Sequence, residues 1–118
     1  MADRVENEKA KKISFVIAVY RNAGAITRTY SKIREVFAES LPGHDYEFVF
    51  VDDGSDDGSL EEILALRTGD ERVKAITFTR NFGQMAAMLA GFSHATGDAA
   101  INISADLQDP AELIPQMI

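Results

Sequence analysis

The sequence predicts an α/β fold: a Rossmann-like, three-layer α/β/α arrangement around a four-stranded parallel sheet. Four short apolar runs, residues 13–20, 46–51, 73–78 and 99–103, alternate with segments of helical character. Alternation of this kind gives parallel strands joined by right-handed crossovers, with helices on both faces. Three of the runs end in polar residues. Because the carboxyl ends of parallel strands share one edge of the sheet, where ligands bind, that edge is the expected site.

The composition limits the possible classes of protein. The chain has 118 residues, enough for one domain with its own core. Its net charge of −7 argues against binding to duplex nucleic acid, which requires a basic face. Cysteine is absent, which excludes disulfides, zinc-thiolate sites and a thiol nucleophile. The sequence shows no signal peptide and no apolar run near the roughly 20 residues that a membrane-spanning helix needs.

The first elements follow a charged arm. Residues 1–12 carry charges of both signs and few apolar side chains, so the domain is expected to span residues 13–118. Ile13 to Tyr20 is apolar and rich in β-branched residues, which favours a buried strand. A helix is predicted next because four apolar residues recur at spacings of four, three and four: Ile26, Tyr30, Ile33 and Phe37. Pro42 and Gly43 would end it.

The second predicted strand stops at two adjacent carboxylates. Phe48 to Val51 is a continuous apolar run, typical of a strand that is buried on both faces. Asp52 and Asp53 follow it directly. Adjacent like charges resist desolvation and belong at an exposed strand end. This carboxylate pair is therefore a candidate for ligand binding.

The turn after the pair also has a purely structural interpretation. Ser59 followed by Glu62 fits a capping box, and Asp57 favours a helix N-terminus. Capping explains these three residues but not the carboxylate pair, which precedes the turn, so both interpretations of the pair stay open. An EF-hand calcium loop is excluded, because the acid required at its twelfth position would be Leu64.

The rest of the chain continues the alternation. Strands are predicted at residues 73–78 and 99–103, and a helix at residues 84–95 is dense in alanine and glycine, which allows close approach to a sheet. Met85 and Met88 in that helix are expected in the core. Two more helices are indicated by apolar spacing or capping residues: Leu60, Ile63 and Leu64 for one, and Asp109, Pro110 and Glu112 for the other.

Four motifs, in this order, resemble those of the GT-A family 2 glycosyltransferases. They are Val-Ile-Ala-Val-Tyr20, Val-Asp-Asp-Gly-Ser55, Arg-Asn-Phe-Gly83 and Ala-Asp-Leu-Gln-Asp-Pro110. The resemblance runs from Ile13 to the last residue, and the most similar subgroup is that of the polyprenyl-phosphate sugar transferases, typified by dolichol-phosphate mannosyltransferase. It implies an inverting enzyme that transfers a sugar from a nucleotide-diphosphate sugar to an acceptor, a polyprenyl phosphate.

The resemblance also implies roles for individual residues. The base and ribose of the nucleotide would contact the end of the first strand and the acidic turn: Ala18, Val19, Tyr20, Asp52 and Asp53. Arg80 would contact base or phosphate, and Gly83 would give backbone clearance for the turn into the third helix. Ser104, Ala105 and Asp106 occupy the place of the family's Asp-x-Asp motif. Asp106 would there hold Mg²⁺ or Mn²⁺ on the diphosphate, as suits a hard oxygen ligand.

Some features depart from the family pattern. Ser104 replaces the first acid of the Asp-x-Asp motif, and Ala18 stands where proline is usual before Tyr20. The family's acceptor site, often its catalytic base, and the subgroup's C-terminal membrane helices have no counterpart here. The chain therefore resembles a donor-binding half with uncovered apolar surface that favours self-association. It is expected in the cytoplasm, and the full-length protein at the inner face of the membrane. A nucleotide-binding module without turnover is the alternative.

Two other α/β classes fit less well. A receiver-type phosphotransfer domain needs an aspartate after its third strand, where this chain has Arg80, and a fifth strand with a lysine. A dinucleotide-binding fold needs a G-x-G-x-x-G motif after the first strand, and this sequence has none there.

Overall fold

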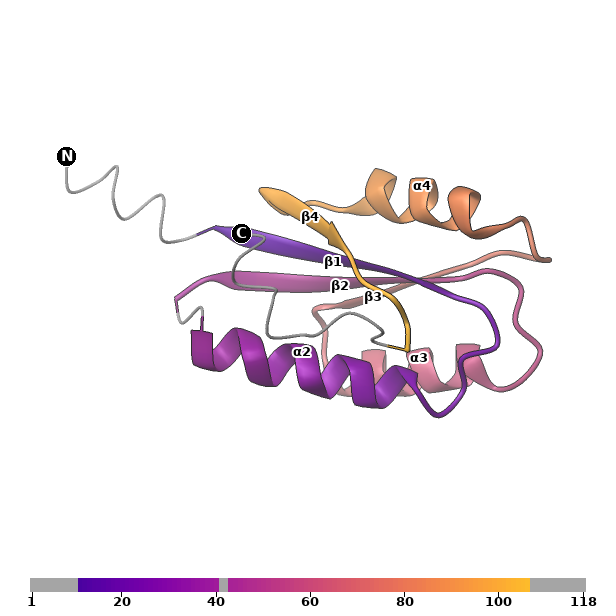
Figure 1. The fold of residues 1–118 in the computed structure, drawn as a ribbon, viewed down its shortest axis with the longest axis horizontal. Coiled ribbons are helices and arrows are strands. Elements are labelled where there is room, and N and C mark those ends of the chain that lie inside the picture. Colours follow the sequence, from indigo (N-terminus) through magenta and orange to yellow (C-terminus); the bar gives the residue numbers. More distant parts are fainter. Residues whose placement is uncertain (1–10, 41–42, 107–118) are drawn as a thin grey trace.

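The computed structural model describes residues 11–40 and 43–106, and it confirms the predicted architecture. Four strands form one parallel sheet in the order β3-β2-β1-β4 (Figure 1). The elements follow one another along the chain as β1 (Lys12–Val19), α2 (Ile26–Ser40), β2 (Asp45–Asp52), α3 (Ser59–Gly69), β3 (Val73–Thr77), α4 (Gln84–His94) and β4 (Ala99–Asn102). The fourth predicted helix and most of the charged arm lie outside the described residues.

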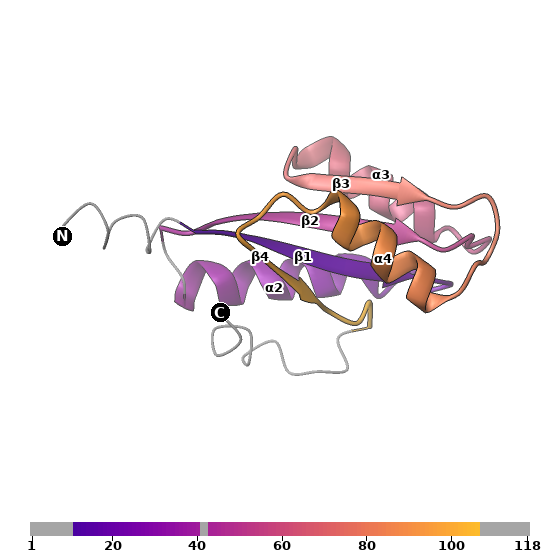
Figure 2. The same ribbon diagram turned by 90° about the horizontal axis from the view of Figure 1, so that it is seen from above.

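The two faces of the sheet are covered unequally. In the described part of the chain, helices α2 and α3 lie on one face and α4 is the only helix on the other (Figures 1 and 2). The larger core lies under α2 and α3, where Phe15 and Phe48 of the central strands pack with their ring centroids 5.4 Å apart. The predicted stripe of α2 is buried in this core. The smaller core joins Ala87 of α4 to valines of β1 and β2. The central strands β1 and β2 are thus buried on both faces, as their apolar runs predict.

Some local predictions are wrong. The first strand starts at Lys12, one residue inside the expected arm. Met85 is 69% exposed, because it lies on the side of α4 that faces away from the sheet. Ser59 is the first residue of α3 and Gly58 is its N-cap, so no capping box forms. Asp57 does serve the helix start as predicted, since its Oδ1 accepts the backbone N–H of Ser59 at 3.1 Å.

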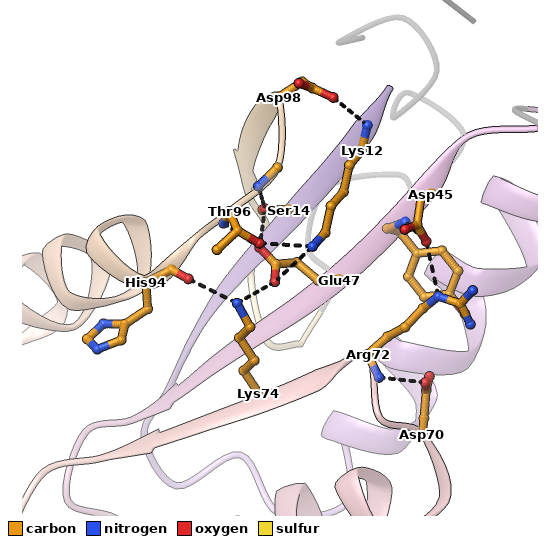
Figure 3. Close-up of polar contacts among 12 residues, drawn as sticks. Lys12, Ser14, Asp45, Glu47, Asp70, Arg72, Lys74, His94, Thr96 and Asp98 are labelled. Carbon is orange, nitrogen blue, oxygen red and sulfur yellow. Dashed lines mark hydrogen bonds and ion pairs between the residues drawn. The ribbon is translucent and has the colours of Figure 1, made fainter. Parts of the chain in front are cut away.

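At the amino ends of the strands a buried carboxylate connects β1, β2 and β3 with the loop between α4 and β4 (Figure 3). Glu47 of β2 is 2% exposed. Its Oε2 accepts bonds from the Ser14 hydroxyl at 2.5 Å and the Thr96 backbone N–H at 2.6 Å, and Lys74 Nζ lies 2.7 Å from Oε1. Burial raises the pKa of Glu47, but these donors outweigh it and bring the pKa to about 2. Lys74 also donates to the carbonyl of His94, so this cluster holds the C-terminal end of α4 and the chain entering β4.

Among residues 11–40 and 43–106, no helix combines the length and the apolar character that crossing a membrane would require.

Candidate functional site

An open cleft of about 580 Å³ lies at the carboxyl edge of the sheet. Four separate segments of the chain line it: Ala18, Val19, Tyr20 and Asn22; Asp53; Asn81, Gly83 and Gln84; and Asn102, Ile103, Ser104 and Ala105. The first segment ends β1, the second ends β2, the third opens α4 and the last ends β4. The parallel topology therefore brings described residues from each of the four motifs to one site.

Asp53 is the member of the carboxylate pair that borders this cleft. It is 3% exposed, and its carboxylate accepts three hydrogen bonds: from Phe82 N at 2.7 Å, Gly83 N at 3.1 Å and Asn81 Nδ2 at 3.1 Å. A carboxylate offers about four acceptor positions, so roughly one remains for a ligand. Asp53 thus holds the turn before α4 and still presents an acceptor at the cleft.

Asp52 is not among the lining residues. Its side chain is buried, and it accepts two long hydrogen bonds, from Ser55 N at 3.3 Å and Thr77 Oγ1 at 3.4 Å. These contacts tie the acidic turn to the end of β3. The geometry therefore separates two carboxylates that the sequence presents as equivalent.

The acidic turn and the Arg-Asn-Phe-Gly turn are in direct backbone contact. Gly54 has a φ of +75°, and a Cβ placed on it would lie 2.3 Å from the carbonyl carbon of Arg80. Gly83 has a φ of +104°, which only glycine adopts readily. Arg80 is exposed and is not among the residues that line the cleft. Its guanidinium carbon lies 4.4 Å from the ring centroid of Phe82.

The segment after β4 carries the candidate metal ligand. Asp106 is exposed beyond the lining residues Ser104 and Ala105, and its carboxylate accepts a hydrogen bond from the Ser104 hydroxyl. Within the part of the chain that the structure describes, no group of three or more His, Cys, Asp or Glu side chains forms a preformed metal cage. A single carboxylate beside a hydroxyl suits a cation that takes most of its oxygen ligands from a diphosphate and water. The donor set therefore fits Mg²⁺ or Mn²⁺ carried by a substrate.

The loop after β1 is held by the acidic residues of the α3 region. Glu62 accepts the backbone N–H groups of Gly24 at 2.8 Å and Thr27 at 2.7 Å, and so caps α2 instead of its own helix. Asp57 Oδ2 accepts the N–H of Ala23 at 3.2 Å. Burial alone would raise the pKa of Glu62. The hydrogen bonds from the Thr27 hydroxyl and from the backbone N–H groups of Gly24 and Thr27 outweigh burial, so the pKa of Glu62 is lowered. The acidity of this stretch therefore serves mainly to position the loop beside the cleft.

Sequence reasoning missed several lining residues. The structure adds four polar residues to the cleft lining, to which the sequence patterns assign no role: Asn22, Asn81, Gln84 and Asn102. Their common signal is an amide side chain just after a strand or next to one of the motifs. Amides donate and accept hydrogen bonds without carrying a charge, which suits recognition of polar groups on a ligand.

Comparison with known proteins gives one family. A family model described as glycosyl transferase family 2 matches residues 14–118. A prophage bactoprenol glucosyl transferase homolog of Escherichia coli (strain K12) is 47% identical over 107 residues, which is 91% of this chain and 34% of that protein. The chain thus spans about a third of the length of this curated relative.

Solved structures share the fold. A mannosyltransferase from Pyrobaculum calidifontis, PcManGT, in complex with GDP-Man and Mn²⁺, superposes with a TM-score of 0.73 at 22% identity, over 88% of this chain and 30% of that one. Residues 1–349 of S. aureus TarS, in complex with UDP, give a TM-score of 0.65 at 23% identity, over 80% of this chain and 27% of that one. Since the family model covers nearly the whole sequence, the chain belongs to glycosyl transferase family 2.

Proposed function

We propose that this chain forms the donor-binding part of an inverting glycosyltransferase, which transfers a sugar from a nucleotide-diphosphate sugar to a polyprenyl phosphate. One observation carries the proposal: described residues from all four motifs, far apart in sequence, line a single cleft at the carboxyl edge of a parallel sheet. Ligands of open α/β sheets bind at this edge. Family membership and the names of the relatives support the same activity.

In this proposal the nucleoside lies between the ends of β1 and β2. Ala18, Val19 and Tyr20 form one wall, and the remaining acceptor position of Asp53 takes an N–H of the base. Asp52 acts from beneath, by holding the turn. Gly83 has a positive φ that residues with a side chain rarely adopt, and it lets the turn before α4 approach the nucleotide.

The diphosphate lies toward the end of β4. Ser104 and Ala105 line that part of the cleft, and Asp106 would hold Mg²⁺ or Mn²⁺ there. When bound, such a cation stabilises the negative charge of the departing nucleoside diphosphate. Arg80, which is exposed beside the cleft, is available to approach a phosphate. Ser104 stands in place of the first acid of the family's Asp-x-Asp motif, so we expect weak cation binding without nucleotide.

The acceptor is assigned by chemistry and by the relatives. Its phosphate oxygen would bond to the anomeric carbon as the bond from that carbon to the diphosphate breaks, with inversion, and the nucleoside diphosphate leaves. A phosphate is already anionic, so this attack needs little help from a base. The curated relative is named for bactoprenol, which supports a lipid acceptor. We propose in addition that the full-length protein acts at the cytoplasmic face of a membrane.

The test is calorimetric titration of the chain with UDP, GDP and CDP forms of common sugars, with Mn²⁺ and with a chelator. One nucleotide should bind more tightly with Mn²⁺. Asp106→Ala should abolish that enhancement and leave metal-free binding unchanged or slightly stronger, because a bare carboxylate repels a diphosphate. Ser104→Asp should increase the enhancement.

Asp98→Ala provides a matched control, because Asp98 is an exposed carboxylate at the start of β4 that accepts the backbone N–H of Lys12. It should leave the effect of Mn²⁺ unchanged. The metal role is wrong if Asp106→Ala weakens binding equally with Mn²⁺ and with chelator. The donor role is wrong if no nucleotide-diphosphate sugar binds under either condition.

A further inference from the structure

Tyr20 is in contact with a charged pair, Arg21 and Asp56, neither of which lines the cleft. Tyr20 is 40% exposed and lines the cleft. The guanidinium carbon of Arg21 lies 5.0 Å from the centroid of this ring, within the range of a cation–π contact. Arg21 does not line the cleft itself. The guanidinium therefore packs on the ring of Tyr20, which lines the cleft, but does not itself line the cleft.

Asp56 fixes the guanidinium in that position. Its two carboxylate oxygens accept from Arg21 Nε at 3.0 Å and Nη2 at 3.1 Å, a bidentate pair. Bidentate geometry defines the plane of the guanidinium as well as its location. The Arg21 backbone is held too, since its N–H donates to the Ser55 hydroxyl at 2.9 Å.

The backbone conformation of Arg21 is also unusual. Arg21 has a φ of +55° and is the only non-glycine residue with positive φ in the described part of the chain. For a residue other than glycine this backbone conformation costs about 1 kcal/mol or more, and residues in this conformation are concentrated at functional sites. Glycine would remove that cost, but it would also remove the guanidinium. The strained conformation therefore goes together with the placement of the Arg21 side chain.

We propose that Arg21 and Asp56 are positioning residues that hold the Tyr20 ring as a preformed wall for the nucleobase. This inference rests on the proposed function, because the wall matters only if a base lies in the cleft. It assigns Asp56 a role outside the ligand contacts, through Arg21 and then Tyr20. It also explains why an acidic turn can stand next to an anionic ligand: this carboxylate is neutralised by its bidentate partner.

The first test measures the ring directly and needs no ligand. The chain has three tyrosines, so ¹³C relaxation of their rings can be assigned with Tyr20→Phe. Arg21→Gly, which adopts positive φ freely, and Asp56→Asn should both increase the motion of the Tyr20 ring. Tyr30 and Tyr46 should not change. Glu61→Gln, which alters an exposed acid of the same region, is the matched control.

The second test measures binding of UDP and GDP, and of inorganic pyrophosphate, each with Mn²⁺. Exposed ion pairs contribute little, so Arg21→Gly and Asp56→Asn should weaken binding of the preferred nucleotide about two- to five-fold. Pyrophosphate, which lacks a base, should bind these variants as it binds the wild type. In a Tyr20→Ala background, Asp56→Asn should cause no further loss, because Asp56 acts through that ring.

Each outcome decides between the proposals. Equal losses for nucleotide and pyrophosphate, additive losses with Tyr20→Ala, or an unchanged ring in both variants would overturn the positioning role. If the wild type binds no nucleotide, the proposed donor site fails instead, and the relaxation measurement still shows whether the pair holds the ring.

Discussion

Replacing Asp53 by alanine should destabilise the fold as well as weaken nucleotide binding. The carboxylate is buried and accepts bonds from the backbone N–H groups of Phe82 and Gly83 and from the Asn81 amide. Alanine leaves all three donors without this acceptor. The turn that opens α4 then loses its attachment to the end of β2.

The magnitude follows from the donors that lose a partner. A hydrogen bond to a charged group contributes about 1.5–3 kcal/mol. The Asn81 amide is exposed and can turn to water, so the two backbone donors carry most of the loss. Water also reaches part of this turn, which reduces the cost. We therefore expect Asp53→Ala to lower the free energy of unfolding by about 2–4 kcal/mol, a large effect for one surface-proximal residue.

Equilibrium urea unfolding of the chain measures this change, with Glu61→Ala as an exposed acidic control that should change the free energy by no more than about 0.5 kcal/mol. Amide hydrogen exchange at Phe82 and Gly83 should accelerate in Asp53→Ala. A loss below about 1 kcal/mol, with exchange unchanged at both amides, would refute the assignment of Asp53 as the anchor of this turn.

Three further predictions concern packing, pH and association. Gly54→Ala should destabilise by about 2–3 kcal/mol in urea unfolding, because its Cβ would overlap the Arg80 backbone and its φ is positive; an unchanged midpoint would contradict the contact between the two turns. The pKa of Glu47 is lower in the folded state than its ordinary value of 4.5, so ionisation of Glu47 stabilises the fold by about 3 kcal/mol. This contribution should be complete above pH 4.5 and should be lost as the pH falls toward about 2. Glu47→Gln should remove that dependence from acid unfolding curves, and a variant with the same acid slope would contradict it. Leu89 is 61% exposed on α4 beside other exposed apolar side chains, so Leu89→Lys should reduce self-association of the chain in sedimentation at high concentration. A wild type that stays monomeric there would contradict this expectation.

Much of the fold could be predicted from the sequence, because the signals are local and repeated. The run from Phe48 to Val51 has to be buried on both faces, and a parallel strand between two others provides that environment. The stripe that includes Ile26 and Phe37 has one buried side, as found in α2. The common edge of the polar strand ends follows from parallel topology alone.

The partners of individual acids could not be predicted in this way. Asp52 and Asp53 are adjacent and chemically identical, yet only the three-dimensional path of residues 81–83 gives Asp53 its three donors. Glu62 fits a capping box by spacing, but the N-terminus of α2 lies close enough to take its carboxylate. Long-range contacts of this kind leave no periodic signal in the sequence.

The exposed side of α4 could not be predicted from its sequence either. Its alanines and Gly91 indicate close packing on a sheet, and Ala87 is indeed buried there. Apolar residues on every side of a helix usually indicate a helix covered all round. In the described chain the side that carries Met85 is exposed, because α4 is the only helix on its face of the sheet.

The most direct test of the central claim is where a nucleotide binds. Backbone amide shifts of the chain, recorded during titration with the preferred nucleoside diphosphate and Mn²⁺, should change most in residues 18–22, 81–84 and 102–106, the segments around the cleft. Amides near the groove lined by Arg34, His44 and Tyr46, at the start of β2, should stay unchanged. Shifts concentrated at that groove, or spread without preference over the sheet, would contradict a donor site at the carboxyl edge.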